Sequence, residues 1–344
     1  MAADHVLSME VVTASGRFVT ASEKVNANLF WALRGGGGSA FGIVTSVTIR
    51  AFPKIKVALM DYLISTATGT SEKAFWEAFR AYFDTSVSIV KEGHYTYFTL
   101  AKVASAGGAL FHRMQPYFAP GWTADELQEF TKPMIDRMKA AGAVVQPVYR
   151  EFDNFHDAWK AGFQPENWGV PTARMTSRLF PRKNWCSGQK RNETFQAIKE
   201  VVEDGAAIQA IGLGPGEVKE WPDNAVNDAW RKTILHTVVL NMWDKNAPEE
   251  VQKAESDKIT YSWGETLRKV TPGSGAYLNE ADVIEPDFQQ AFYGEKYEKL
   301  LAIKKKWDAT GLFYAPTAVG SEEWEMSEKI FGNIPSQNSK LCRR

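Results

Sequence analysis

Four consecutive glycines, Gly35–Gly38, are the residues whose types and spacing most directly suggest chemistry. Glycines in a row cost much backbone conformational entropy, so a folded protein keeps them for a reason. Either the loop needs turns with φ > 0, or a ligand lies directly on its backbone, where N–H groups can approach a phosphate or a dinucleotide. A purely structural hairpin or crossover is the alternative that the sequence leaves open.

The order of elements around the glycines excludes the two standard nucleotide-binding loops. A P-loop runs strand, loop, helix and ends in Gly-Lys-Ser/Thr, and the Rossmann fingerprint also places its strand first. Here a short amphipathic helix over 29–33 precedes the glycines, and a strand rich in β-branched residues over 43–52 follows them. Alternation of Val47 and Ile49 with Thr48 predicts that this strand is half-buried.

A catalytic base is harder to assign than the loop. The candidates on expected strands are His94, Tyr97, Tyr149 and His236, since His and Tyr side chains can take a proton from a substrate. Each of them alone is more often a packed core or surface residue, and His236 alternates onto a face with apolar neighbours. No Ser-His-Asp set and no metal-spaced cluster stands out. The sequence therefore leaves the catalytic residue unassigned and predicts no metal site.

The amino-acid composition argues against several classes of function. The 344 residues carry 40 Lys and Arg against 41 Asp and Glu, a net charge of −1, which gives no electrostatic case for nucleic acid or an acidic membrane surface. The two cysteines, Cys186 and Cys342, build neither a disulfide framework nor a C-x-x-C site. No apolar run reaches membrane-spanning length, and no signal peptide is visible after Met1. We expect a small-molecule partner, no nucleic acid and no membrane, with the oligomeric state open.

The elements that position these residues fall into three sections. A β-hairpin is expected over 5–20, with Ala14-Ser-Gly16 as its turn. From about 57 to 270, strands and helices alternate without a phosphate loop, which is typical of a self-contained α/β or α+β unit with one antiparallel sheet. The last section contains a helix over 295–307 and grows polar toward its end.

Three stretches together resemble one family. They are Leu29-Phe-Trp-Ala-Leu-Arg-Gly-Gly-Gly-Gly with Phe41-Gly-Ile-Val-Thr, then Tyr277-Leu-Asn-Glu-Ala-Asp282, then Phe292-Tyr-Gly294 through Gly311-Leu-Phe-Tyr314. As a set they are similar to the FAD-linked oxidases of the vanillyl-alcohol-oxidase/p-cresol-methylhydroxylase fold, specifically the berberine-bridge-enzyme-like branch of fungi and plants. The similarity extends over essentially the whole chain, with the middle looser.

The resemblance implies an α+β fold. It consists of a partial FAD-binding domain of the p-cresol-methylhydroxylase type and a substrate domain with an antiparallel sheet backed by helices. The expected divisions are 1–56 for the end of the FAD-binding domain and 57–275 for the substrate domain. The berberine-bridge-like segment then returns to the FAD domain over 276–330, and a frayed tail follows over 331–344.

The resemblance also implies that residues are missing. In the family, a Gly-Gly-His segment and a later cysteine commonly bind the flavin covalently, and both lie N-terminal to the hairpin that begins this sequence. Cys186 and Cys342 lie in the wrong segments to replace that cysteine. We therefore expect FAD to bind non-covalently at most in this chain. The absent part is expected to leave a sheet edge and apolar surface unpaired, which predicts poor solubility or dependence on a partner. Complete members are often secreted, so the localisation stays open.

By the same resemblance, the FAD site consists of backbone from the glycine loop and the strand after it, with two residues of the C-terminal segment near the flavin. The implied cofactor-binding residues are Gly37, Gly38, Gly42, Ile43, Val44, Tyr277 and Asn279. The implied activity is FAD-dependent oxidation of a small-molecule alcohol or secondary metabolite, with hydride transfer to flavin N5 and reoxidation by O2. Two alternatives remain: a truncated, non-catalytic homologue that acts as a binding or scaffold protein, and a cofactor-free cyclase that reuses the substrate cleft.

Overall fold

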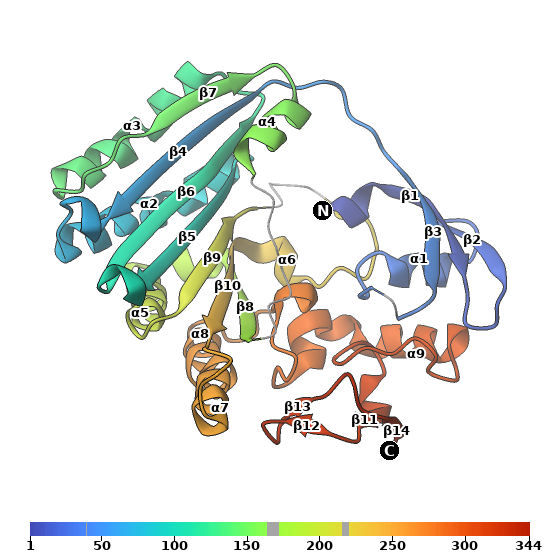
Figure 1. Ribbon diagram of the computed structural model, residues 1–344. Coiled ribbons are helices and arrows are strands. Elements are labelled where there is room, and N and C mark those ends of the chain that lie inside the picture. The colour runs from blue at the N-terminus through green and yellow to red at the C-terminus, as the bar shows by residue number, and fades with distance from the viewer. Residues whose placement is uncertain (39, 164–171, 215–219) are drawn as a thin grey trace. The chain divides into compact units, whose positions relative to one another are not determined.

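The computed structural model describes residues 1–38, 40–163, 172–214 and 220–344, which form two compact units (Figure 1). Unit 1 joins Met1–Phe52 with 220–231 and Gly275–Arg344, and unit 2 joins 53–214 with Lys232–Ser274. The α+β fold class expected from the sequence is confirmed. No helix among the described residues is both long and apolar enough to cross a membrane.

Unit 2 is built on a seven-stranded antiparallel sheet of order β7-β4-β6-β5-β9-β10-β8. Its strands are β4 (Val57–Ser65), β5 (Tyr95–Val103), β6 (Ala109–Pro120), β7 (Val148–Phe152), β8 (Ala173–Pro181), β9 (Ala207–Gly212) and β10 (Thr233–Met242). Its α-helices are α2 (Glu72–Lys91), α3 (Ala124–Ala140), α4 (Phe155–Gly162), α5 (Gly188–Glu203), α7 (Glu249–Asp257) and α8 (Gly264–Val270), and shorter helical turns are η2 (Thr66–Thr68), η3 (Ala104–Ala106), η4 (Arg182–Trp185) and the π-helix η5 (Lys258–Trp263).

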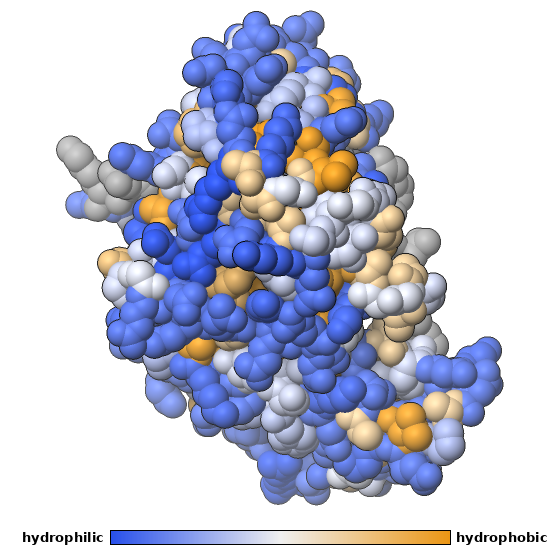
Figure 2. Space-filling view, turned by 90° about the vertical axis from the view of Figure 1, so that its left-hand side faces the viewer, coloured by the Kyte–Doolittle hydropathy of each residue, from blue (hydrophilic) through white to orange (hydrophobic). Residues whose placement is uncertain are grey.

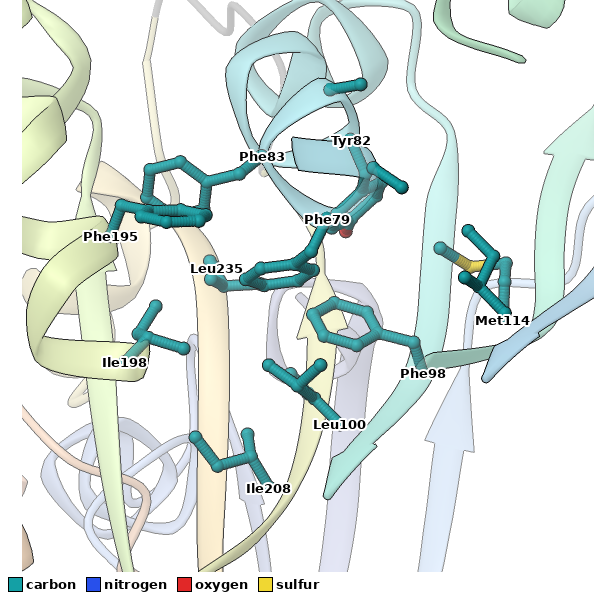
Figure 3. Packing of buried hydrophobic residues seen from close by; sticks show 14 of the residues in the cluster. Phe79, Tyr82, Phe83, Phe98, Leu100, Met114, Phe195, Ile198, Ile208 and Leu235 are labelled. Carbon is teal, nitrogen blue, oxygen red and sulfur yellow. The ribbon is translucent and has the colours of Figure 1, made fainter. Parts of the chain in front are cut away.

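Several helices cover one face of this sheet. The other face, called the open face below, has a helix packed on it only at one end. Helices α2, α3, α5 and α8 pack on the covered face around one aromatic-rich core, in which Phe79 of α2 contacts Phe98 of β5 and Phe195 of α5 (Figure 3). Side-chain caps begin two of these helices, since Ser71 caps α2 and Thr123 forms a capping box with Glu126 on α3. On the other face, α4 covers one end over β4 and β6.

The exterior agrees with the balanced composition. In the view of Figure 2, hydrophilic residues predominate and hydrophobic ones lie in separate patches.

Unit 1 contains a three-stranded antiparallel sheet of order β2-β1-β3. Its elements are η1 (Ala2–His5), β1 (Val6–Val12), β2 (Phe18–Ser22), α1 (Ala27–Leu33), β3 (Ile43–Ile49), η6 (Leu278–Glu280), the π-helix η7 (Gln289–Tyr293), η8 (Gly294–Lys296), α9 (Tyr297–Trp307), η9 (Ser321–Glu323), β11 (Trp324–Met326), β12 (Lys329–Ile330), β13 (Ile334–Pro335) and β14 (Leu341–Arg343); α6 (Ala229–Lys232) lies at the boundary of the two units. The core of unit 1 forms where α1 and α9 pack together with β1 and β2.

Two expectations about unit 1 differ from the structure. The strand after the glycines is not half-buried: all residues of β3 are exposed. The described core of unit 1 takes Met9, Val11 and Ala21 from β1 and β2, whereas β3, an edge strand as β2 is, contributes no residue to it. The tail over 331–344 is not simply frayed, because β14 pairs with β11 and β13 with β12.

The segment 220–231 lies in unit 1, although the ranges expected from the sequence placed it on the substrate side. Backbone and side-chain hydrogen bonds tie it there. The backbone N–H of Ala225 donates to the carbonyl of Arg34 at 3.0 Å. The Nζ of Lys296 donates to the carbonyl of Val226 at 2.6 Å and to Asp228 at 2.8 Å. The sequence between two unit-2 strands thus becomes part of unit 1.

Candidate functional site

The four glycines have different surroundings. A Cβ on Gly35 would fall 2.3 Å from the backbone nitrogen of Val226, and one on Gly36 would fall 2.5 Å from the Ala32 carbonyl oxygen. These two positions are therefore glycine because the chain packs on itself there. Gly37 has φ +91°, a left-handed conformation that favours glycine. A Cβ on Gly38 would meet nothing within 4 Å, so its backbone is open to a ligand.

A pocket of about 940 Å³ adjoins this loop. All seven residues that the resemblance assigned to the cofactor line it: Gly37, Gly38, Gly42, Ile43, Val44, Tyr277 and Asn279. Gly42 fits because its Cα packs against β1, where a Cβ would lie 2.6 Å from Val11 Cγ1. The structure thus brings together one loop, the start of β3 and the turn η6.

The C-terminal wall of the pocket is held by short polar contacts. The Nδ2 of Asn279 donates to the hydroxyl oxygen of Tyr277 at 2.8 Å. The hydroxyl of Tyr293, another lining residue, donates to the carbonyl of Thr317 at 3.0 Å, and burial raises the pKa of this phenol. Its side chain also lies 3.4 Å from the place of a Cβ on Gly37. Hydrogen bonds therefore hold the hydroxyl groups of both lining tyrosines, Tyr277 and Tyr293.

Sequence reasoning missed the contribution of segment 220–231. Val226, Asn227 and Trp230 line the pocket, and the rings of Trp230 and Tyr277 meet edge to face with centroids 5.4 Å apart. Asn227 is anchored on both sides, since its Nδ2 donates to the Ala291 carbonyl at 3.1 Å and its Oδ1 accepts from the Ala229 N–H at 2.9 Å. No local sequence pattern predicts that this segment lines the pocket. The one available signal is a tryptophan that follows asparagine-containing turn residues.

The N-terminal residues Met1–Ala3 complete the lining, with further apolar side chains from Leu33, Leu278, Phe292 and Phe313. Among the described lining residues no side chain is charged, and none is His or Cys. The described part of the chain also has no group of three or more His, Cys, Asp or Glu side chains placed to hold a metal ion. The side chains that line the pocket are thus uncharged and mainly apolar, the N-terminal ammonium group of Met1 is paired with Asp4 at 2.8 Å, and one side of the pocket is glycine backbone.

The four candidate bases all belong to unit 2 and fall on different faces of its sheet. His94 is buried beside Trp122, its Nδ1 lies 2.8 Å from the Tyr117 hydroxyl, and burial lowers its pKa to about 4. The Tyr149 hydroxyl lies 2.7 Å from that of Thr131 on α3, so it also faces the helices.

Tyr97 and His236 lie on the open face instead. Both are opposite Ile211 of β9 in the sheet register, which puts them in one row. His236 is 1% exposed, whereas Tyr97 lines a small cavity. The structure therefore separates the four candidates into two structural residues and two that share a face.

Comparison with known proteins agrees with this architecture. Residues 276–320 match the family described as "Berberine and berberine like". The chain is 31% identical over 331 residues to FAD-linked oxidoreductase ZEB1 of Gibberella zeae, covering 95% of this chain and 56% of that protein. It is 31% identical over 349 residues to the bifunctional decalin synthase calF of Penicillium decumbens, covering 100% of this chain and 58% of that protein.

A solved structure is similar over the same extent. The VAO-type flavoprotein MtVAO615 from Myceliophthora thermophila C1 superposes with a TM-score of 0.84 at 26% identity, covering 99% of this chain and 60% of that one. The chain thus spans rather more than half the length of the relatives it matches. Fold, C-terminal segment and relatives together show that the chain belongs to the berberine-bridge-enzyme-like family of the vanillyl-alcohol-oxidase fold, in which relatives such as ZEB1 are named FAD-linked oxidoreductases.

Proposed function

We propose that unit 1 binds FAD in the pocket along the glycine loop, and that the chain serves an FAD-dependent oxidase or dehydrogenase of a small-molecule alcohol or secondary metabolite. The observation that carries the proposal is that all seven residues implied by the resemblance line one cavity. They come from two parts of the sequence that lie far apart, 37–44 and 277–279. Separate segments meet at one cavity in this way when they share a ligand.

The properties of the pocket fit such a group. Its volume of about 940 Å³ lies at the upper end of the roughly 300–1,000 Å³ of small-molecule sites. Its uncharged, apolar walls suit a flat ring system. The unobstructed backbone at Gly38 suits a phosphate, because N–H groups without a neighbouring Cβ can approach it closely.

FAD, when bound, supplies a hydride acceptor that O2 can reoxidise. The chain's own residues bind the cofactor and orient it. The backbone of Gly37 and Gly38 offers N–H donors, and the amides of Asn227 and Asn279 offer donors and acceptors for polar ring edges. The paired rings of Trp230 and Tyr277 exclude water from one side. With no His or Cys among the described lining residues, these contacts are non-covalent.

The experiment is a binding measurement on the full chain. We expect purified protein mixed with FAD to keep absorption bands near ~370 and ~450 nm through a desalting column, as bound flavin does. Gly38→Leu should weaken FAD binding by about tenfold or more, because the side chain occupies the open space above the loop. Gly188→Ala is the matched control, since Gly188 also has no atom within 4 Å of its Cβ position but begins α5 in unit 2.

A folded chain that stays colourless in about 0.1 mM FAD would sink the proposal, as would equal FAD affinity in Gly38→Leu and the wild type. Circular dichroism on each variant separates lost binding from lost folding.

A second candidate is a ring-forming reaction without net redox chemistry. The similarity of the chain to a protein named bifunctional decalin synthase supports this second candidate function. Turnover of a cyclisable substrate by protein stripped of flavin would favour this second function, whereas strict dependence on added FAD would favour the first.

A further inference from the structure

The open face of the unit-2 sheet carries a polar row that the proposed FAD site does not use. In the register of neighbouring strands, Arg113 of β6 lies opposite Thr99 of β5, and Thr99 lies opposite Gln209 of β9. These strands lie side by side in Figure 1. Because side chains alternate between faces, the three project away from the core to which Phe98 and Met114 belong.

A cavity of about 130 Å³ lies along this row. It is lined by Tyr97, Phe98, Thr99, Arg113, Gln115, Gly162 and Gln209. Gln209 donates a hydrogen bond from its amide to the Tyr97 hydroxyl oxygen, which fixes the ring in the wall. Tyr97 also contacts Phe163, with ring centroids 5.8 Å apart. One side of the cavity is therefore aromatic and the other is polar.

Gly162, at the end of α4, is one of the residues that line this cavity. A Cβ at this position would lie 3.0 Å from Pro116 Cγ and 3.3 Å from Leu59 Cδ1. The end of the helix therefore packs directly on the sheet beside the cavity.

The guanidinium of Arg113 is the charge of this cavity. Arg113 is an exposed residue, and none of the ion pairs among the described residues includes it; Arg150, not Arg113, pairs with Asp61. The acidic group nearby, Asp61, is already bound by Arg150. Burial raises the pKa of Asp61, and the charges of Arg150 and Arg113 oppose that rise. This part of the face thus has two guanidinium groups for one carboxylate, and one cation remains for a ligand.

We propose that this cavity binds the carboxylate of a small organic acid, with Arg113 as the anion-binding residue. The planar guanidinium donates two parallel N–H bonds to a carboxylate. The hydroxyl of Thr99 and the amide of Gln115 add neutral hydrogen-bonding groups. The Tyr97 ring supports the apolar body of the acid. All lining residues belong to unit 2, so the proposal stands whether or not FAD binds to unit 1.

Benzoate titrated into the full chain at low salt, followed by saturation-transfer NMR or calorimetry, tests the proposal. We expect saturable binding by the wild type, binding at least about tenfold weaker by Arg113→Gln, and intermediate binding by Arg113→Lys, whose ammonium lacks the planar fork. The neutral isostere benzamide should bind at least about tenfold more weakly than benzoate. Arg50→Gln, which removes the same charge from an exposed position in unit 1, should bind like the wild type.

A second variant keeps the test decisive if Arg113→Gln does not fold. Thr99→Leu adds apolar volume beside Arg113 on the neighbouring strand without altering the charge of the cavity, and it should also abolish benzoate binding. Unchanged benzoate affinity in both variants would overturn the proposal, as would equal affinity for benzamide or no saturation by the wild type at about 10 mM. Displacement of benzoate by equimolar inorganic phosphate would overturn the carboxylate assignment in favour of a bare anion site.

Discussion

Gly35 lies against Val226 so closely that a Cβ on the glycine would fall 2.3 Å from the valine backbone nitrogen. These residues are far apart in the sequence, yet together they form one corner of the candidate FAD pocket. The four glycines therefore have two different structural roles. Its first half is required for chain packing, and its second half is open for a ligand.

This division predicts the effect of Gly35→Ala. The added methyl meets backbone rather than a flexible side chain, and the residue has φ +116°. We expect the free energy of unfolding to fall by about 2 kcal/mol or more. Urea denaturation measures the change. Gly38→Ala is the internal control and should stay within about 0.5 kcal/mol of the wild type. Equal stability of the two variants would contradict the packing role of Gly35.

The buried pair of Lys304 and Asp308 predicts a second stability effect. Lys304 donates from Nζ to Asp308, to the Ala40 carbonyl at 2.7 Å and to the Phe313 carbonyl at 2.6 Å. Burial alone would raise the pKa of Asp308, but the hydrogen bonds from Lys304 and two backbone N–H groups outweigh it, and the pKa lies below its usual range. Lys304→Met leaves this carboxylate without its cation, so we expect a loss of about 3–5 kcal/mol.

Thermal or urea unfolding of five proteins checks this: the wild type, the two single variants Lys304→Met and Asp308→Asn, their double variant, and a control. The neighbouring variant Lys305→Met, at a lysine whose side chain is 62% exposed, should change stability by no more than about 0.5 kcal/mol. The double variant Lys304→Met/Asp308→Asn should cost less than the two single substitutions added together. Strict additivity would show that the two side chains do not depend on each other.

His112 predicts a gain of stability. It is fully buried, and neither ring nitrogen has a hydrogen-bond partner among the residues that the structure describes. Its neighbours are the rings of Tyr62, Phe79, Tyr82 and Phe98, at centroid distances of 5.2 to 5.7 Å. Replacing an unsatisfied polar ring by leucine should raise the free energy of unfolding by about 1–2 kcal/mol at neutral pH.

His94→Leu is the control variant for the stability measurement on His112→Leu. His94 is equally buried, but its Nδ1 lies 2.8 Å from the Tyr117 hydroxyl. Leucine there strands the tyrosine hydroxyl, so this variant should be less stable than the wild type. Both changes are read from denaturant midpoints. A loss of stability in His112→Leu would mean that ring packing outweighs the missing hydrogen bonds.

The same histidine predicts a pH dependence. Burial lowers the pKa of His112 from 6.5 to about 3. The unfolded chain therefore binds a proton near pH 6.5 that the folded chain does not bind, and stability falls as the pH is lowered from about 6.5 toward 3. His112→Leu lacks this loss. The difference between variant and wild type should grow by about 2 kcal/mol between pH 7 and pH 5. A difference independent of pH would contradict the assignment.

Local patterns predicted the elements and part of the site, each for a physical reason. The capping box of α3 and the glycine run depend on residues that are close in sequence, so both can be recognised from the sequence alone. Tyr277 and Asn279 were found only through the resemblance. Asn227 and Trp230 were missed because they enter unit 1 through long-range contacts, such as that of Lys296 with the Val226 carbonyl.

The burial of β3 was misjudged for the same reason. Alternation shows which side chains share a face, but it does not show whether another element covers that face. Arg113 carried no signal at all in the sequence. Its place beside Thr99 and Gln209 depends on the register of three strands.

The exposed strand β3 also governs how the polypeptide behaves when it is concentrated. Its sequence, Ile43-Val-Thr-Ser-Val-Thr-Ile49, contains no charge and no proline, the two features by which edge strands resist extension by another chain. A segment of this kind serves as a template for intermolecular sheet growth. Light scattering during concentration should therefore report the state of this edge, and a single lysine at the outward-facing Ser46 would act as a gatekeeper that keeps preparations monodisperse.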